Sequence, residues 1–470
     1  MREGAIKSRT GTTALTLVLL LGGCSPEGEP EASPVPYVTP SALLPEPPPP
    51  PPSSSPRPAS LRSQGSPPAA GKGGRDPGDV NGDGFADLNF VMSHGPWSPD
   101  LVIVYGSKDG LNPGTRTVVP GAHLEFTGPT RTADLDGDGF ADVLVHGHVV
   151  QRGLATDSPH ILWGGPKGVD PEVPPTAVPT SLTSPGFRHD TVPGDFDGDG
   201  KADLALKTPM AKGADSLVVL YGPFTRQGVP HRHTVQPVPV DVEVQSLVAG
   251  RIDGRRATDL LVRDTEGDGQ AASWLVRGGP GGLSRQSRRL NEGNTLALGD
   301  FDGDGRGDVV VADSGSRTNE PGYETEPPRV DGVMTVHFGG AGRAPQVFEN
   351  LRFARGATVG DFDGDGSDDL AIDRDPDGVE LLRGGRNGLR RGGKVIHRAG
   401  PATDPTGRKL RASERMARSR AAADYDGDGR DELLLTWSPI NQVPEWGLAL
   451  SLWWVTDGDR DETTFGTKGW

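Results

Sequence analysis

Four carboxylates lie within nine residues in the stretch from Asp195 to Asp203, which reads DFDGDGKAD. Two unit charges at contact distance near a protein surface repel each other by roughly 4 kcal/mol at an effective dielectric constant of about 20. A cation held between the alternating acidic residues removes this repulsion, and the interleaved glycines let the chain bend around it. An all-oxygen ligand set with several carboxylates suits calcium better than zinc or copper. The stretch therefore predicts a calcium-binding loop.

We number this loop from its first aspartate, so Asp195 is position 1 and Asp203 is position 9. Side-chain oxygens are then available at positions 1, 3, 5 and 9, and the backbone carbonyl of Lys201 is available at position 7. An EF-hand loop would carry a bidentate glutamate at position 12, but position 12 here is Leu206. Apolar residues at positions 10 and 12 share one face of a strand, so the loop precedes a β-strand. This excludes an EF-hand and argues against a dockerin-like module, in which a helix follows the loop.

The loop pattern recurs along the chain. Intact copies begin at Asp79, Asp134, Asp195, Asp300, Asp361 and Asp424. A degenerate copy begins at Arg251, where arginines replace the acidic residues at positions 1 and 5 while Asp253 and Asp259 remain. Its following strand is intact, and two arginines can neutralise two aspartates without an ion. We interpret this copy as a repeat that keeps its fold element and has lost its metal site.

Each repeat must also contain the strands that position its loop. A β-rich run that ends in glycine follows each of the first six loops, as in Val102–Gly106 and Val218–Gly222. We expect four short strands per repeat: one before the loop, one after it, one ending at this glycine and one after the next turn. Four strands per repeat of this size fit a propeller blade, and seven repeats predict an all-β, seven-bladed β-propeller over residues 75–470. The first blade lacks a clear strand before its loop, and the last blade would be completed by residues 463–466 or 35–38.

The loop, the strand after it and the β-rich run, which ends in Tyr-Gly in some repeats, form a combination that resembles the FG-GAP repeats of integrin α-subunits. Such repeats also occur in bacterial VCBS-type proteins. The resemblance extends from about Gly78 to the C-terminus. It implies that each intact loop binds calcium between the first and second strands of its blade, giving about six ions. The implied ligands, with the residues that supply the position-7 backbone carbonyl, are Asp79, Asn81, Asp83, Phe85, Asp87, Asp134, Asp136, Asp138, Phe140, Asp142, Asp195, Asp197, Asp199, Lys201, Asp203, Asp300, Asp302, Asp304, Arg306, Asp308, Asp361, Asp363, Asp365, Ser367, Asp369, Asp424, Asp426, Asp428, Arg430 and Glu432.

The N-terminal residues predict a lipid-anchored protein. Three basic residues precede an apolar run over residues 14–21, which is too short to span a bilayer. The run leads into Leu21-Gly-Gly-Cys24, which resembles a bacterial lipobox and makes residues 1–23 a lipoprotein signal peptide with Cys24 as the lipidated residue. The alternative is an ordinary cleaved signal with an incidental cysteine. Cys24 is the only cysteine, so no intramolecular disulfide is possible, and calcium is expected to stabilise the domain instead.

Residues 24–74 have the composition of a tether. Pro26 to Pro68 contains 16 prolines, six of them consecutive, separated by serine, alanine and glycine. Such a segment cannot bury a core and is expected to be extended or disordered. It predicts a domain presented away from the membrane.

The net charge of −16 comes largely from the loops, so it does not predict a basic partner, and we expect no nucleic-acid binding. The sequence contains no Gly-x-Ser-x-Gly or His-Glu-x-x-His motif, and His146-Gly-His148 fits loop histidines better than zinc ligands. We therefore expect a monomeric, non-enzymatic binding or adhesion module on the extracellular face of a bacterial membrane, or secreted. Its ligand would be a protein, a glycan or a wall polymer. The alternatives are a propeller-type polysaccharide lyase and a structural or assembly lipoprotein of the cell envelope.

One connection is a candidate ligand contact. Residues 397–420 carry an excess of arginine over acidic residues, which would suit an anionic wall polymer or lipid headgroups. The alternative interpretation is a solvated basic loop without a ligand.

Overall fold

The computed structural model describes residues 65–470 except 75, 94–98, 122–123, 152–153, 180, 182–189, 210–214, 241–243, 245, 264–269, 315–331, 341, 352–355, 375–376, 405–406, 440–450 and 469. The predicted signal peptide, Cys24, the strand candidate at residues 35–38 and most of the predicted tether lie outside these residues. The chain is already part of the folded domain at Gly65, before the predicted boundary at Arg75: Gly65 donates a hydrogen bond to the carbonyl of Arg116 over 3.2 Å, and Gly74 donates one to Gly139 over 2.7 Å.

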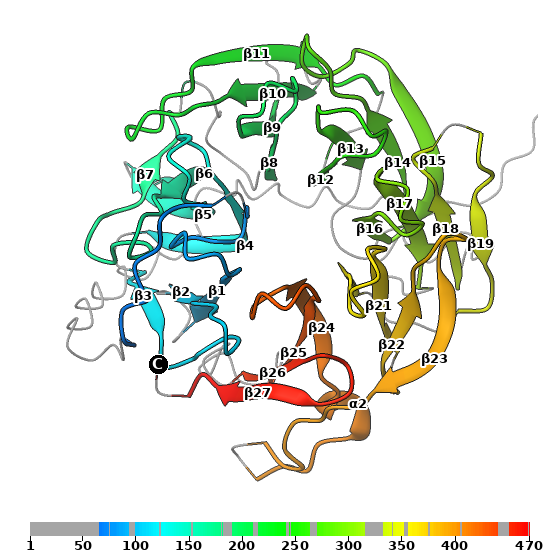
Figure 1. Ribbon diagram of the computed structural model, residues 1–470. Helices are drawn as coiled ribbons and strands as arrows, with labels where there is room; N and C mark the ends of the chain where they lie inside the picture. The colour runs from blue at the N-terminus through cyan, green and yellow to red at the C-terminus, as the bar shows by residue number, and fades with distance from the viewer. Residues whose placement is uncertain are drawn as a thin grey trace, which may run out of the picture. The chain divides into compact units, whose positions relative to one another are not determined.

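Seven antiparallel sheets arranged in a ring form a β-propeller (Figure 1). The first four sheets, in chain order, consist of β1 (Leu88–Ser93), β2 (Pro99–Val104) and β3 (Arg116–Val119); β4 (Glu125–Ala133), β5 (Asp142–Gln151), β6 (Leu154–Leu162) and β7 (Thr176–Ala177); β8 (Thr191–Gly194), β9 (Asp203–Pro209), β10 (Asp215–Tyr221) and β11 (Arg232–Pro237); and β12 (Ser246–Gly250), β13 (Asp259–Arg263), β14 (Ala271–Val276) and β15 (Ser287–Gly293).

The remaining three sheets consist of β16 (Thr295–Gly299), β17 (Asp308–Asp313), β18 (Val333–His337) and β19 (Gln346–Phe348); β20 (Ala357–Gly360), β21 (Asp369–Arg374), β22 (Gly378–Arg383) and β23 (Arg390–Ile396); and β24 (Arg418–Ala423), β25 (Glu432–Trp437), β26 (Leu452–Thr456) and β27 (Asp461–Gly466). The short helix α2 (Ala412–Arg415) lies in the connection before β24. Among the described residues, no helix is long and apolar enough to cross a bilayer.

The strand order within a blade is the predicted one. In six blades the strands follow each other from the centre of the ring outward, with the acidic loop between the first and second strands (Figure 1). In these blades, pairing of the first two strands brings the two ends of the loop together. Gly194 pairs with Asp203, for example, and Gly360 pairs with Asp369. The last blade is completed by β27, as one of the two predictions for it proposed. The all-β, seven-bladed prediction is confirmed.

Blade 1 differs from the others because its sheet contains three strands within the described residues. Within residues 65–78, of which all but 75 are described, the chain ahead of its loop forms no strand that pairs with β1. It instead forms a parallel bridge between Ser66 and Thr115, next to the outer strand β3, and then hydrogen-bonds to the loops, where Lys72 donates to the carbonyl of Gly82 over 2.8 Å. The predicted irregularity of this blade is therefore confirmed.

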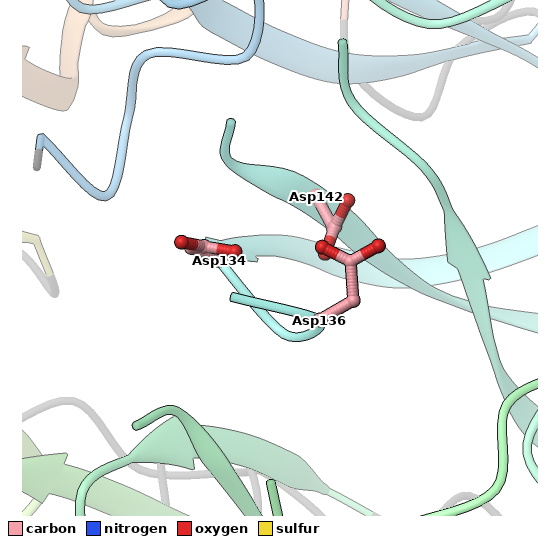
Figure 2. Close-up of side chains that lie close together, drawn as sticks. All are labelled: Asp134, Asp136 and Asp142. Atoms are coloured by element: carbon pink, nitrogen blue, oxygen red, sulfur yellow. The ribbon is translucent and has the colours of Figure 1, made fainter. Parts of the chain in front are cut away.

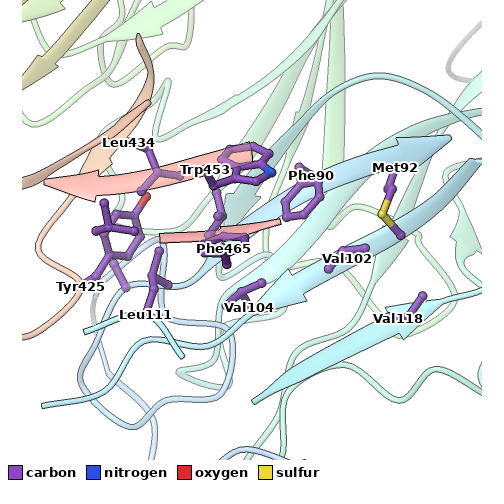
Figure 3. Packing of buried hydrophobic residues seen from close by; sticks show 13 residues of the cluster. Phe90, Met92, Val102, Val104, Leu111, Val118, Tyr425, Leu434, Trp453 and Phe465 are labelled. Carbon is purple, nitrogen blue, oxygen red and sulfur yellow. The ribbon is translucent and has the colours of Figure 1, made fainter. Parts of the chain in front are cut away.

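The apolar core lies between blades. Seven clusters of buried side chains are found among the described residues, and each combines residues of two neighbouring blades. The cluster between blades 7 and 1 closes the ring (Figure 3): Phe90 of β1 packs on Trp453 of β26 with ring centroids 4.8 Å apart, and Phe465 of β27 stacks on Trp470. The guanidinium of Arg116 lies 4.3 Å from the Trp470 ring centroid. Side-chain packing therefore joins the last blade to the first.

Candidate metal-binding loops

Position 1 of each intact loop organises the turn through its carboxylate. In the second loop, Gly137, Asp138 and Gly139 donate backbone hydrogen bonds to Asp134 over 2.8, 3.1 and 3.0 Å. The first, sixth and seventh loops repeat this set of three bonds. Glycine is required at positions 4 and 6 because the φ angles there are positive, 79° at Gly137 and 90° at Gly139.

In four of the intact loops, the aspartates at positions 3 and 5 each accept a backbone hydrogen bond from the loop on Oδ1 and none on Oδ2. In the second loop Asp138 donates its N–H to Oδ1 of Asp136 over 3.2 Å, and Phe140 donates to Oδ1 of Asp138 over 3.1 Å. The third, fifth and seventh loops repeat both bonds. The Oδ2 atoms of positions 3 and 5 are therefore the oxygens left for a cation.

Position 9 joins the loop to the third strand of its blade. Asp203 accepts the N–H of Phe196 on Oδ2 over 2.9 Å and the N–H of Gly222 on Oδ1 over 3.0 Å. The same pair of bonds forms at Asp87, Asp142, Asp259 and Asp308. Position 9 therefore has a structural role in addition to its predicted role as a ligand.

The hydrogen bond from this glycine N–H to position 9 explains why the β-rich runs end in glycine, a feature that was visible in the sequence without a physical explanation. A Cβ at Gly222 would lie 2.2 Å from the carbonyl oxygen of Ala202, and one at Gly278 would lie 2.1 Å from that of Thr258. Such distances are far below any real contact, so only glycine lets the two backbones approach closely enough for the N–H to reach position 9.

Neighbouring loops are connected by backbone hydrogen bonds. The N–H at position 8 of one loop donates to the carbonyl at position 1 of the preceding loop: Ala141 to Asp79 over 3.0 Å, Thr258 to Asp195 over 2.6 Å, and Gly307 to Arg251 over 2.8 Å. Asp368 and Asp431 donate in the same way to Asp300 and Asp361. The loops therefore lie next to each other on one face of the ring.

Arginines from outside the loops contact the Oδ2 atoms of positions 3 and 5. The Nε of Arg226 lies 2.5 Å from Oδ2 of Asp136, and its Nη2 lies 2.6 Å from Oδ2 of Asp138. Arg232, Arg343 and Arg383 contact Oδ2 of Asp197, Asp302 and Asp363, respectively. These arginines could not be predicted from the sequence pattern, because they are far from the loops in the chain: Arg226 is 88 residues from Asp138.

The residues of the intact loops fit a hard cation. In five loops, three carboxylates bring one oxygen each to within 4.8 Å of the others: Asp134, Asp136 and Asp142; Asp195, Asp197 and Asp199; Asp300, Asp302 and Asp304; Asp361, Asp363 and Asp365; and Asp424, Asp426 and Glu432. Figure 2 shows the first group, with the side chains of Asp136 and Asp142 next to each other. Among the described residues of the loops, the buried oxygens without a hydrogen-bond partner are Oδ1 of Asn81, Asp195 and Asp363 in intact loops and Oδ2 of Asp253, which is ion-paired with Arg255, in the degenerate loop. These are the donor atoms that calcium prefers.

Burial of the position-9 carboxyls favours their protonated form. It raises the pKa of Asp142, Asp203 and Asp308 to about 7, and that of Glu432 to about 8, although their backbone hydrogen bonds act in the opposite direction. A divalent cation next to them would favour the ionised form. Protons and a cation would therefore compete for these groups near neutral pH.

The degenerate loop of blade 4 keeps its position-9 bonds and loses the acidic positions 1 and 5. Asp253 lies 3.1 Å from the Nε of Arg255 and 3.7 Å from Arg277, so one of the two predicted arginines neutralises it. Asp259 is held by the backbone N–H groups of Ile252 and Gly278. Position 6 is Arg256, and Asn350 is the only described residue other than glycine with a positive φ, so this loop also lacks the second glycine turn.

The other candidate sites are engaged within the fold. His146 is buried on strand β5, with its Nδ1 3.8 Å from Asp157, so it is not a loop histidine. In the basic connection, Arg398 pairs with Asp461, Arg408 pairs with Asp404 and Glu414, and Arg411 pairs with Glu414. These pairs favour the interpretation of the connection as a solvated loop.

The comparisons with known proteins agree with the repeat pattern. A family model for the FG-GAP repeat matches residues 187–221, which include the loop of blade 3 and strands β8, β9 and β10. A search of curated proteins finds no match for the chain. Five of the other six blades repeat the strand order of blade 3, and blades 1, 2, 4, 5 and 6 repeat its glycine contact. Residues 187–221 therefore match the FG-GAP repeat, and the seven-bladed β-propeller of the chain fits an FG-GAP propeller protein.

Proposed function

We propose that the six intact loops bind calcium and that the calcium-stabilised propeller is a non-enzymatic binding module on the outer face of a bacterial membrane. The fold supports a binding or adhesion module in general, because propellers of this family typically lack enzymatic activity. The observation that carries the calcium assignment is that the aspartates at positions 3 and 5 keep Oδ2 free of backbone hydrogen bonds from the loop. In four intact loops a cationic side chain already lies on at least one of these atoms.

Calcium should raise the melting temperature of the protein. A ligand present at 100 times its dissociation constant stabilises the folded state by about 2.7 kcal/mol per independent site. We would melt the protein in excess chelator and in millimolar calcium and count the bound ions by elemental analysis after dialysis. We expect a clear upward shift and six ions per chain. Indistinguishable melting curves would refute the calcium assignment.

A matched pair of variants locates the ions. Asp136 is position 3 of an intact loop, and Asp253 is position 3 of the degenerate loop. Asp136→Asn should reduce the ion count by one and reduce the calcium-dependent shift in melting temperature. Asp253→Asn should leave both unchanged, because we assign no ion to blade 4. A seventh ion in the parent protein, lost in Asp253→Asn, would contradict this assignment.

The membrane location follows from the sequence of the N-terminus, which lies outside the described residues. If Cys24 carries a lipid, Cys24→Ala should move the protein from the membrane fraction to the soluble fraction or the medium. A variant that stays membrane-bound to the same extent would contradict lipid attachment at Cys24. The ligand class is addressed by an array of glycans and wall polymers probed with the calcium-loaded protein, in which binding to no member would leave a protein ligand as the favoured class.

A further inference from the structure

A small pocket lies next to the second loop, between blades 2 and 3. Its volume is about 250 Å³, and its lining includes Trp163, Gly168, Asp170, Val173, Pro174 and Arg226. Trp163 directly follows β6, the third strand of blade 2, and Arg226 belongs to the turn between β10 and β11 of blade 3. The indole is held in place by a hydrogen bond of 2.8 Å from its Nε1 to Oγ1 of Thr176. The pocket therefore combines a fixed aromatic ring, apolar edges, one carboxylate and one cation.

Arg226 belongs to the pocket and to the second loop at the same time. Its guanidinium lies 5.0 Å from the ring centroid of Trp163. The same guanidinium contacts Oδ2 of Asp136 at 2.5 Å and Oδ2 of Asp138 at 2.6 Å. These two oxygens are the ones that the second loop leaves for a cation, because the Oδ1 atoms accept backbone hydrogen bonds. Arg226 and a calcium ion therefore compete for the same atoms.

We propose that this pocket binds a carboxylated sugar, such as a hexuronate, and that calcium in the second loop makes Arg226 available to it. This inference rests on the proposed calcium site. While Arg226 is paired with Asp136 and Asp138, its charge is neutralised and its Nε and Nη2 donors are occupied. With a divalent cation on those carboxylates, the guanidinium loses both partners and is repelled by the ion. It keeps its place beside Trp163, where it can form a bidentate pair with a ligand carboxylate.

The lining favours a sugar acid over a simple anion. Asp170 would repel a small inorganic anion, but its carboxylate can accept hydrogen bonds from sugar hydroxyls. The indole ring and the Val173 and Pro174 side chains provide an apolar surface for the C–H face of a sugar ring, and Val173 is 51% exposed. A pocket of about 250 Å³ is below the range of roughly 300–1,000 Å³ found for drug-sized ligands, which suits a single sugar unit.

Saturation-transfer NMR with methyl β-D-glucuronide tests the inference, and methyl β-D-glucoside is the matched neutral probe. In saturating calcium we expect the glucuronide to bind the full-length protein more tightly than the glucoside. In chelator, at a temperature below melting, glucuronide binding should weaken by roughly tenfold or more, since a charge-assisted pair is lost. Equal glucuronide binding in calcium and in chelator would overturn the proposal.

Two arginine variants separate the pocket from the loops. Arg226→Met should abolish the preference for the glucuronide and raise the calcium affinity of the second loop, measured by calorimetry. Arg343→Met should raise the calcium affinity of the fifth loop, because Arg343 contacts Asp302, and should leave glucuronide binding unchanged. Glucuronide binding that survives in Arg226→Met would overturn the proposal. If the parent protein binds calcium but not the glucuronide, this inference fails alone; if calcium neither binds nor stabilises, the proposed function fails first.

Discussion

Replacing Asp259 in the fourth blade separates the structural role of position 9 from its proposed role as a ligand. The Asp259 side chain is fully buried and accepts the N–H of Ile252 over 3.2 Å and that of Gly278 over 2.9 Å. Its loop has arginine at positions 1 and 5, and we assign no ion to it. Any loss of stability in an Asp259 variant therefore reflects contacts of the carboxylate within the fold, chiefly these two backbone bonds, and no ion.

The magnitude follows from the number of donors that lose their acceptor. Each buried, unsatisfied N–H destabilises the fold by about 1–3 kcal/mol. Asp259→Ala removes both acceptors and should reduce the free energy of unfolding by about 2–6 kcal/mol. Asp259→Asn keeps one carbonyl oxygen and should lose about 1–3 kcal/mol. Burial raises the pKa of Asp259, which means that the buried charge itself is unfavourable, so the asparagine value should lie near the lower limit.

Calorimetric melting measures these losses. The entropy of unfolding is about 2.1 cal/mol/K per residue, so 1 kcal/mol corresponds to roughly 1.2 °C in a domain of about 400 residues. We expect a decrease of roughly 2–7 °C for Asp259→Ala and roughly 1–4 °C for Asp259→Asn, the same in calcium and in chelator. Asp253→Ala, which removes a partly exposed ion pair, is the control and should change the melting temperature by less than about 1 °C.

Two results would refute this reasoning. An Asp259→Ala variant that melts with the parent would mean that the two backbone bonds contribute nothing to stability. A loss that appears in calcium and disappears in chelator would mean that Asp259 acts through an ion, and that blade 4 has a metal site after all.

Three further predictions follow from the same loops and from the closure of the ring. Gly278→Ala should lower the free energy of unfolding by about 2–3 kcal/mol, because its Cβ would lie 2.1 Å from a backbone oxygen. Gly279→Ala is the control and should be nearly neutral, because a Cβ there would meet no atom within 4 Å. Equal melting temperatures of the two variants would contradict this prediction. In chelator, the melting temperature should rise as the pH falls from 8 to 5. Asp142, Asp203 and Asp308 have a pKa of about 7 in the folded protein against 3.8 ordinarily, so the folded state binds more protons than the unfolded state in this range. A melting temperature that falls on acidification would contradict this pH dependence. Trp470→Ala should lower the free energy of unfolding by about 1–3 kcal/mol, the sum of one aromatic stack and one cation–π contact. Lys468→Ala, at an exposed site, is the control and should change it very little. A Trp470→Ala variant as stable as Lys468→Ala would show that Trp470 does not hold the ring closed.

The sequence predicted the repeats and the strands correctly because both depend on short-range patterns. The loop spacing and the apolar residues at positions 10 and 12 are local signals, and each of them identified a strand that the structure contains, such as β9 after Asp203. The lack of a clear strand directly before the Asp79 loop was visible as well, since residues 71–78 are rich in glycine, and the described residues there contain none.

The parts of the loops that the sequence did not predict depend on contacts between distant segments. Gly222 was visible as part of the sequence pattern, but glycine is required there because the backbone comes close to Ala202, and only the folded blade contains this contact. Arg226 reaches the second loop from the next blade, and nothing in its local sequence distinguishes it from other exposed arginines. Arg251 was expected to neutralise an aspartate, but Arg277, at the end of the third strand, is near Asp253 instead.

Within a loop, position 9 has a structural role as well as its proposed role as a ligand, whereas positions 1, 3 and 5 are proposed ion ligands. This separation has a consequence for how the protein can change over evolutionary time. Position 9 and its glycine hold the blade together, and blade 4 keeps both although positions 1 and 5 have lost their carboxylates. A blade can therefore lose or regain its proposed ion through point substitutions while the ring stays closed. The calcium dependence that we propose for the fold is then a property that selection can adjust one blade at a time, with no change in topology.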